Sequence, residues 1–158
     1  MSSGLVLLLA LGIGIAAGLR CMTAPAVVAW AVHLGWLNLH GSPFVFTGTA
    51  WAVGIFTLLA LVEFVADQLP STPPRTAALG LSARIVTGAL TGACLAIAGG
   101  ATVWLGALAG VIGGVAGAFG GYQARVGLVR TLRVPDFTIA IPEDLVAIGL
   151  GLILVSRF

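Results

Sequence analysis

Glu63 and Asp67 are the first residues whose type and spacing could do chemistry, because both interrupt a long apolar stretch. They are four residues apart, so on a helix both carboxylates lie on the same face. Ionisable side chains in membrane helices are costly and usually face a bundle interior or a wet cavity. The pair predicts a site for an ion, a proton or a cationic substrate, or carboxylates at headgroup depth that pair with Arg84 or Arg20. We favour pairing for Asp67 and leave both readings open for Glu63.

A second acidic pair, Glu143 and Asp144, directly follows Pro142. Proline favours the first turn of a helix, where carboxylates cap free N–H groups and are stabilised by the helix dipole. Neighbouring side chains on a helix point about 100° apart, so one carboxylate can cap while the other faces the bundle. We predict that Glu143 is the inward-facing one.

The basic residues of the chain are all arginines. Arg84 lies inside an otherwise apolar stretch, so its side chain either extends to the membrane interface or forms a buried ion pair with Glu63. Arg125, Arg130 and Arg133 form a basic stretch that favours contact with anionic lipid headgroups over a substrate site. Of these three, we expect Arg125 to reach furthest inward.

Motifs of known chemistry are missing from the sequence. It has no P-loop, nucleophile elbow or HExxH pattern, and His33 and His40 lack metal-ligand spacing. Cys21 and Cys94 lie in or beside apolar segments and are expected to act as small buried hydrophobes. We therefore predict no catalytic residues and no cofactor, and we favour a protein that is not an enzyme. Whether the acidic residues bind a metal stays open.

The composition of the chain indicates the environment in which these residues lie. Of the 158 residues, 59% are hydrophobic and 8% are charged, whereas a soluble domain carries about 25% charged residues. The net charge of +2 is too small to suggest a nucleic-acid partner. Residues 1–158 are therefore expected to form a single transmembrane domain surrounded by lipid.

Apolar stretches of helical length divide the chain into segments. We predict an all-α fold, a polytopic transmembrane helix bundle with about six apolar helical segments. The first two are short, so they form either two thin spans or a broken or re-entrant pair whose turn is buried in protein. The expected segments are residues 4–19, 23–37, 45–69, 78–98, 101–123 and 139–156, with loops at 71–75 and 125–136.

The arginines also predict an orientation, because cytoplasmic loops are rich in Arg. If both termini lie outside, then Arg20, Arg75 and the arginines at 125–133 all face the cytoplasm, and only Arg157 lies outside. The same arrangement collects the charges within the helices near the cytoplasmic side.

Glycines recur at three- and four-residue steps on the fifth segment, at Gly106, Gly110, Gly114 and Gly117. Such a face lets helix backbones approach closely. The partner helix belongs either to the same chain or to a second copy. Because so small a chain would need a partner to enclose a path, we favour a homo-oligomer, with a dimer first.

Several motifs follow one another along almost the whole chain: Gly18-Leu19-Arg20, Glu63 with Asp67-Gln68-Leu69-Pro70, Ala83-Arg84-Ile85-Val86, and Pro142-Glu143-Asp144. Together they resemble the bacterial membrane proteins catalogued as domain of unknown function 4126. The resemblance implies a bacterial inner membrane as the location, and it implies no particular activity. It marks as signature positions Arg20, Glu63, Asp67, Arg75, Arg84, Glu143 and Asp144.

Three functions compete. A small transporter or channel for an ion or solute is favoured, because short helix halves beside a charged site are typical of transporters. A structural or accessory membrane protein comes second, and a lipid-handling membrane enzyme that holds a divalent ion comes third. For the favoured function, the candidate substrate- or ion-binding residues are Glu63, Asp67, Arg84, Glu143, Asp144, Arg20 and Arg125.

Overall fold

The computed structural model describes residues 1–67, 76–133 and 135–158, and within these ranges it contains helices and no strands. In chain order the helices are α1 (Ser3–Leu19), α2 (Thr23–His33), the short 3-10 helix η1 (Pro43–Gly48), α3 (Ala50–Ala66), α4 (Ala78–Ala98), α5 (Val103–Leu132) and α6 (Asp136–Val155). The predicted all-α bundle is confirmed. The predicted loop at 71–75, with Arg75, lies outside the described residues.

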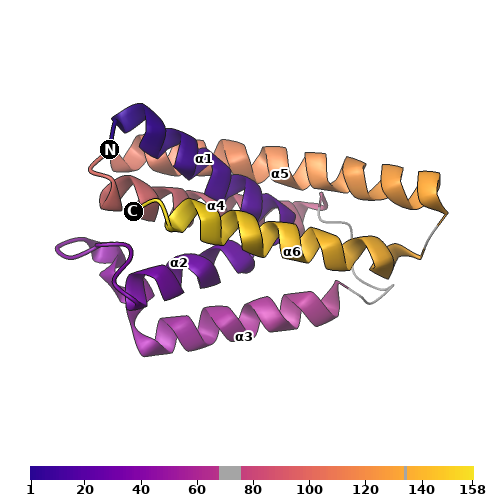
Figure 1. Ribbon diagram of the computed structural model, residues 1–158, viewed down its shortest axis with the longest axis horizontal. Helices are drawn as coiled ribbons and strands as arrows, with labels where there is room; N and C mark the ends of the chain where they lie inside the picture. The colour runs from indigo at the N-terminus through magenta and orange to yellow at the C-terminus, as the bar shows by residue number, and fades with distance from the viewer. Residues whose placement is uncertain (68–75, 134) are drawn as a thin grey trace.

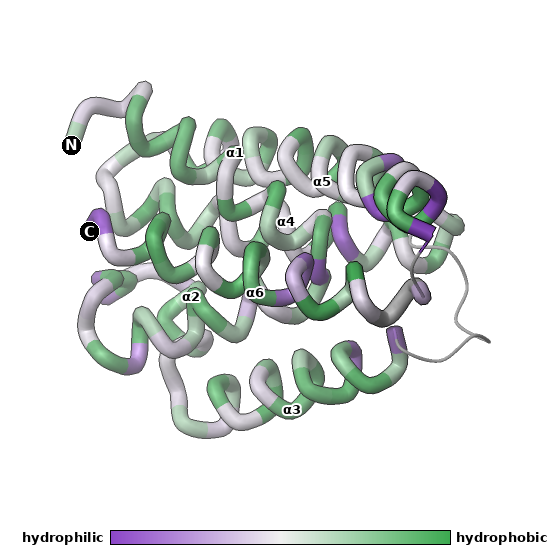
Figure 2. Tube along the Cα trace, turned by 45° about the vertical axis from the view of Figure 1, so that its right-hand side comes forward, coloured by the Kyte–Doolittle hydropathy of each residue, from purple (hydrophilic) through white to green (hydrophobic). Residues whose placement is uncertain are grey.

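The helices lie side by side, and the chain passes repeatedly between the two ends of the bundle (Figure 1). Both termini lie at one end, together with residues 34–49. The strongly hydrophilic residues lie mostly toward the opposite end, which we call the charged end (Figure 2).

Helix length and surface character both indicate a membrane protein. Helix α4 with 21 residues, α5 with 30 residues and the 18 residues Thr138–Val155 of α6 are long and apolar enough to cross a bilayer. Large apolar side chains point outward from the bundle, among them Trp51, Leu79 and Trp104, which are 84%, 85% and 83% exposed. Soluble monomers rarely expose such extensive apolar surface, whereas lipid accommodates it.

The first two helices form a broken pair inside the bundle. Helix α2 has 11 residues, which is about 16 Å of helix and about half of a typical hydrocarbon core. The last turn of α1 packs beside Gly114 and Gly117 of α5, and α5 continues from there to Leu132 (Figure 1). The turn between α1 and α2 therefore lies against the bundle, with Arg20 buried and Cys21 and Met22 half-buried, which fits the broken or re-entrant alternative.

Two helix boundaries at the charged end differ from the prediction. Helix α5 continues through Arg125 and Arg130, where the sequence predicts a loop. Residues 124–132 contain no proline and several good helix formers, so nothing ends the helix earlier. Helix α6 begins at Asp136, which puts Pro142 inside the helix rather than in its first turn. The interpretation of Glu143 and Asp144 as first-turn capping residues is therefore wrong.

Glycines bring α1, α4 and α5 together at close range. A Cβ added to Gly114 of α5 would lie 2.8 Å from the carbonyl oxygen of Arg84 on α4. One added to Gly18 of α1 would lie 2.6 Å from the backbone nitrogen of Ala118 on α5. The predicted close packing of the glycine face is confirmed, and its partners are helices of the same chain. A second copy would have to bind another surface.

Replacing Gly110 with alanine should destabilise the protein by about 1–3 kcal/mol, the usual cost of overpacking a filled core. The reason is that a Cβ at Gly110 would meet the backbone of Gly88. Gly120 is a matched control on the same helix, because a Cβ there has nothing within 4 Å. Gly120→Ala should leave stability unchanged or raise it by about 0.5–1 kcal/mol, because alanine is the better helix former. Thermal unfolding in detergent micelles measures both, and equal melting temperatures would contradict this packing.

Candidate functional site

The helix break between α1 and α2, residues Arg20, Cys21 and Met22, leaves backbone groups without helical partners. The last C=O groups of α1 and the first N–H groups of α2 cannot bond within their own helices. Met22 is the N-cap of α2 but offers no side-chain cap, and Arg20 at the C-cap of α1 has an extended backbone. Unsatisfied polar groups are costly in an apolar bundle, so other side chains have to supply the partners.

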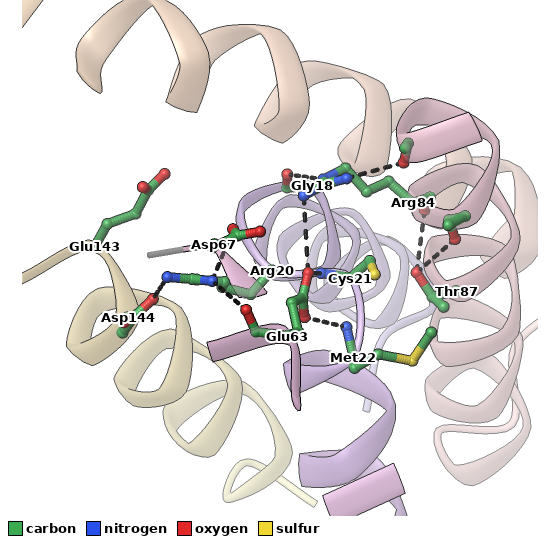
Figure 3. A network of polar contacts seen from close by, with 12 residues as sticks. Gly18, Arg20, Cys21, Met22, Glu63, Asp67, Arg84, Thr87, Glu143 and Asp144 are labelled. Atoms are coloured by element: carbon green, nitrogen blue, oxygen red, sulfur yellow. Dashed lines mark hydrogen bonds and ion pairs between the residues drawn. The ribbon is translucent and has the colours of Figure 1, made fainter. Parts of the chain in front are cut away.

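Glu63 of α3 and Arg84 of α4 supply these partners (Figure 3). The carboxylate of Glu63 accepts the backbone N–H of Cys21 at 2.8 Å and that of Met22 at 2.9 Å. Nε of Arg84 donates to the carbonyl oxygen of Gly18 at 3.0 Å. Nη2 of Arg84 also lies 3.7 Å from Oε1 of Glu63. The predicted ion pair between Arg84 and Glu63 is confirmed, and it caps both sides of the helix break.

Arg20 is 2% exposed and joins three helices. Its Nη1 lies 2.8 Å from Oδ2 of Asp67 on α3, and its Nη2 pairs with Oδ1 of Asp144 on α6 (Figure 3). Its guanidinium carbon also lies 5.8 Å from the centre of the Phe64 ring. The predicted pairing of Asp67 with an arginine is confirmed, and a single arginine links α1, α3 and α6.

Asp144 is the carboxylate of α6 that faces the helix break, a place that the prediction gave to Glu143; the side chain of Glu143 is 10% exposed and pairs with Arg125 instead. Asp144 is 3% exposed and points to Arg20, whereas Glu143 points away from it (Figure 3). The reason is the rotation of α6. Its buried residues form one stripe at three- and four-residue steps, which consists of Ala140, Asp144, Ala147, Gly151 and Val155. These small residues are a sequence signal that could have placed Asp144 inside.

Arg125 is the inward arginine of its stretch, as predicted. Its side chain is 12% exposed, whereas Arg130 and Arg133 are exposed residues. Its Nη1 lies 3.5 Å from Oε2 of Glu143. The candidate residues therefore form two groups. Arg125 and Glu143 pair between α5 and α6, and the other five gather around the helix break: Arg20, Glu63, Asp67, Arg84 and Asp144.

A cleft of about 180 Å³ opens beside Arg20 and Asp144, between α2, α3 and α6. Its walls are mainly apolar and aromatic and include Trp30, Phe64 and Ile148. Neither Oδ2 of Asp144 nor Nε of Arg20 has a hydrogen-bond partner among the described residues. Leaving a buried polar atom unpaired is costly, so this end of the cleft suits a ligand that supplies a partner. Sequence reasoning gave no site role to Phe64 or Trp30, because only the folded chain brings them to the same cleft as Asp144.

A second hollow, of about 510 Å³, lies near the end that holds the termini and is lined in part by His33, His40 and Thr49. Both cavities border α2 and the segment from η1 to α3, so they lie along one line of packing, which we call the α2–α3 seam. Nε1 of Trp30 donates to Oγ1 of Thr57 at 3.1 Å across the seam, and both residues line the cleft beside Asp144.

The carboxylates of the site do not form a metal-ligand set. In residues 1–67, 76–133 and 135–158, no group of three or more His, Cys, Asp or Glu side chains could hold a metal ion. Each carboxylate of Glu63, Asp67, Glu143 and Asp144 is instead directed at an arginine. This arrangement gives no support to an enzyme that works through a bound divalent ion.

The apolar exterior, the buried arginine–carboxylate pairs and the helix break together define an integral membrane helix bundle. The chain belongs to the family described as domain of unknown function (DUF4126), whose profile matches residues 7–156. The resemblance carried by the sequence motifs is thereby confirmed. Comparison with curated proteins and with solved structures gives no match. Since the family description assigns no activity, the function has to be argued from the site.

Arg84→Gln should destabilise the protein by about 3–5 kcal/mol, the usual cost of removing one partner of a buried ion pair. The substitution leaves Glu63 without its arginine and the carbonyl of Gly18 without its donor. Arg133→Gln, at an exposed position, should change stability by no more than about 0.5 kcal/mol. Thermal unfolding in the same detergent compares the two. If Arg84→Gln and Arg133→Gln have the same melting temperature, the ion pair does not hold the helix break.

Proposed function

We propose that this protein moves a small ion or solute across the membrane along the α2–α3 seam, and that Asp144 contacts the solute. The observation that carries the proposal is Oδ2 of Asp144, which is buried at the end of a cleft and has no hydrogen-bond partner among the described residues. Ionisable groups that face a cavity inside a membrane bundle are typical of substrate and ion pathways.

The helix break supports the same proposal. Transporters commonly build their sites from discontinuous helices, whose ends offer dipoles and open backbone groups to the substrate. The N-terminus of α2 lies at the break, and Thr23 in its first turn lines the cleft. Glu63 already occupies the N–H groups of Cys21 and Met22, which leaves the side chains of the cleft as the contacts for a solute.

The alignment of the two cavities indicates the path. The cleft beside Asp144 and the hollow beside His33 and His40 both border the α2–α3 seam, and the hydrogen bond between Trp30 and Thr57 crosses the seam in the wall of the cleft. In this proposal that contact opens when a solute passes. The seam lies within one chain, so the proposal needs no second copy.

The arginine pairing favours a second candidate, a structural or accessory membrane protein. Glu63, Asp67, Glu143 and Asp144 each face an arginine, and the pair of Glu63 with Arg84 has a complete structural role in capping the helix break. In that case the charges hold the helices together and no solute moves.

Flux measured in liposomes that carry the purified protein separates these candidates. The wild type should raise the flux of a small ion or solute above that of empty liposomes. Asp144→Asn should lower this flux by at least about tenfold, which corresponds to about 1.4 kcal/mol of lost interaction. Glu143→Gln is the matched control, because Glu143 is the neighbouring residue on α6 but does not line the cleft. If folded wild-type protein never exceeds empty liposomes for any solute, transport is wrong and the structural candidate remains.

We also propose that the charged end faces the cytoplasm of a bacterial inner membrane, with both termini outside. Support comes from the last turns of α5, which carry Arg125 and Arg130 and lie at the end of the bundle opposite to both termini (Figure 1), because Arg-rich ends are retained in the cytoplasm. Alkaline phosphatase fused after Phe158 should then be active, since it folds only outside the cytoplasm. A fluorescent protein that matures only in the cytoplasm should stay dark at the same position. The reverse pair of results would contradict this orientation.

A further inference from the structure

We infer that the cleft beside Asp144 binds a small primary ammonium ion with a short apolar chain. The inference rests on the transport function proposed above and names the substrate class of the same site. Its evidence is the charge balance around the helix break, the unpaired oxygen of Asp144 and the character of the cleft walls.

The charge balance favours a cation. Around the helix break, the described residues include three carboxylates, on Glu63, Asp67 and Asp144, and two guanidinium groups, on Arg20 and Arg84. An excess negative charge is costly in an apolar interior, and an occupant of opposite charge reduces that cost. An anion would gain little from Arg20, because Asp67 and Asp144 already neutralise that guanidinium group.

The hydrogen-bonding groups favour a primary ammonium ion over other cations. Oδ2 of Asp144 is an acceptor with no partner among the described residues, and an ammonium group carries donors that can satisfy it. The hydroxyl of Thr23 lines the same cleft and can accept a second N–H. A quaternary ammonium ion has no N–H to donate. A hard metal ion prefers a shell of several oxygen ligands, which these mostly apolar walls do not provide.

The walls suit the apolar part of such an ion. Trp30 and Phe64 present aromatic rings, which attract cations, and Ala60, Leu61 and Ile148 present aliphatic surface. A volume of about 180 Å³ restricts the occupant to a short chain. The occupant would lie with its charge at Asp144 and its chain between α3 and α6.

Calorimetric titration of the purified protein in nanodiscs, with n-butylammonium as the probe and empty nanodiscs as the blank, tests this inference. The wild type should show saturable binding of n-butylammonium. Neutral n-butanol, anionic butyrate, tetramethylammonium and sodium should each bind at least about tenfold more weakly, a difference of about 1.4 kcal/mol.

Two variants and a control locate the binding. Asp144→Asn should weaken n-butylammonium at least tenfold by removing the negative charge. Ala60→Leu keeps every charge but fills the cleft, so it should weaken binding even if Asp144→Asn folds poorly. Arg133→Gln, at an exposed position outside the cleft lining, should bind as the wild type does.

The outcomes separate this inference from the transport proposal. Binding with the predicted selectivity but no flux in liposomes supports the site and refutes transport. Flux of another solute, with no n-butylammonium binding, supports transport and overturns the inference. Equal binding of butanol or butyrate, or unchanged binding to folded Asp144→Asn and Ala60→Leu, also overturns it.

Discussion

The helix break between α1 and α2 depends on two side chains from other helices, Glu63 and Arg84, which bond the backbone groups that the break leaves open. Because these side chains belong to α3 and α4, the same bonds fix both helices against the first pair. Helix α3 depends on them most, since its buried residues are Ala52 and Val53, both near its start. Burial of apolar surface between helices gives little driving force in lipid, so polar contacts are what place the other end of α3.

Close packing makes these bonds geometrically possible. Nε of Arg84 reaches the carbonyl of Gly18 because α1 and α4 both lie against the glycine face of α5. Side chains on that face would push the backbones apart and move the donor out of reach. The glycines and the buried charges therefore depend on each other. The glycines set the distance between the helices, and the charged side chains bond the open backbone groups at the helix break.

Within this network of charged side chains, some carboxylates have hydrogen-bond partners for both oxygens and others do not. Glu63 uses both carboxylate oxygens on the backbone N–H groups of Cys21 and Met22, whereas Asp144, which lines the cleft, pairs one oxygen with Arg20 and has no hydrogen-bond partner among the described residues for the other. Two carboxylates that look alike in the sequence thus differ in how fully their oxygens are bonded. Glu63 holds the helix break with both oxygens, and Asp144 is the carboxylate to which we assign the ligand in our proposal.

The sequence by itself determined the all-α membrane class, the break near Arg20 and the close-packed glycine face, and it offered the pairing of Glu63 with Arg84 as one of two alternatives. These follow from composition, from glycine spacing and from the high cost of unpaired charges in an apolar medium, all of which act locally or demand a partner of opposite charge. Only the tertiary structure decided which carboxylate of α6 faces Arg20 and which side chains form the cleft. In lipid the outer face of a helix is as apolar as the inner one, so hydrophobic periodicity does not reveal helix rotation. The stripe of mostly small residues that contains Asp144 can be read in the sequence, but the packing of α6 against its neighbours is what shows that this face is the buried one.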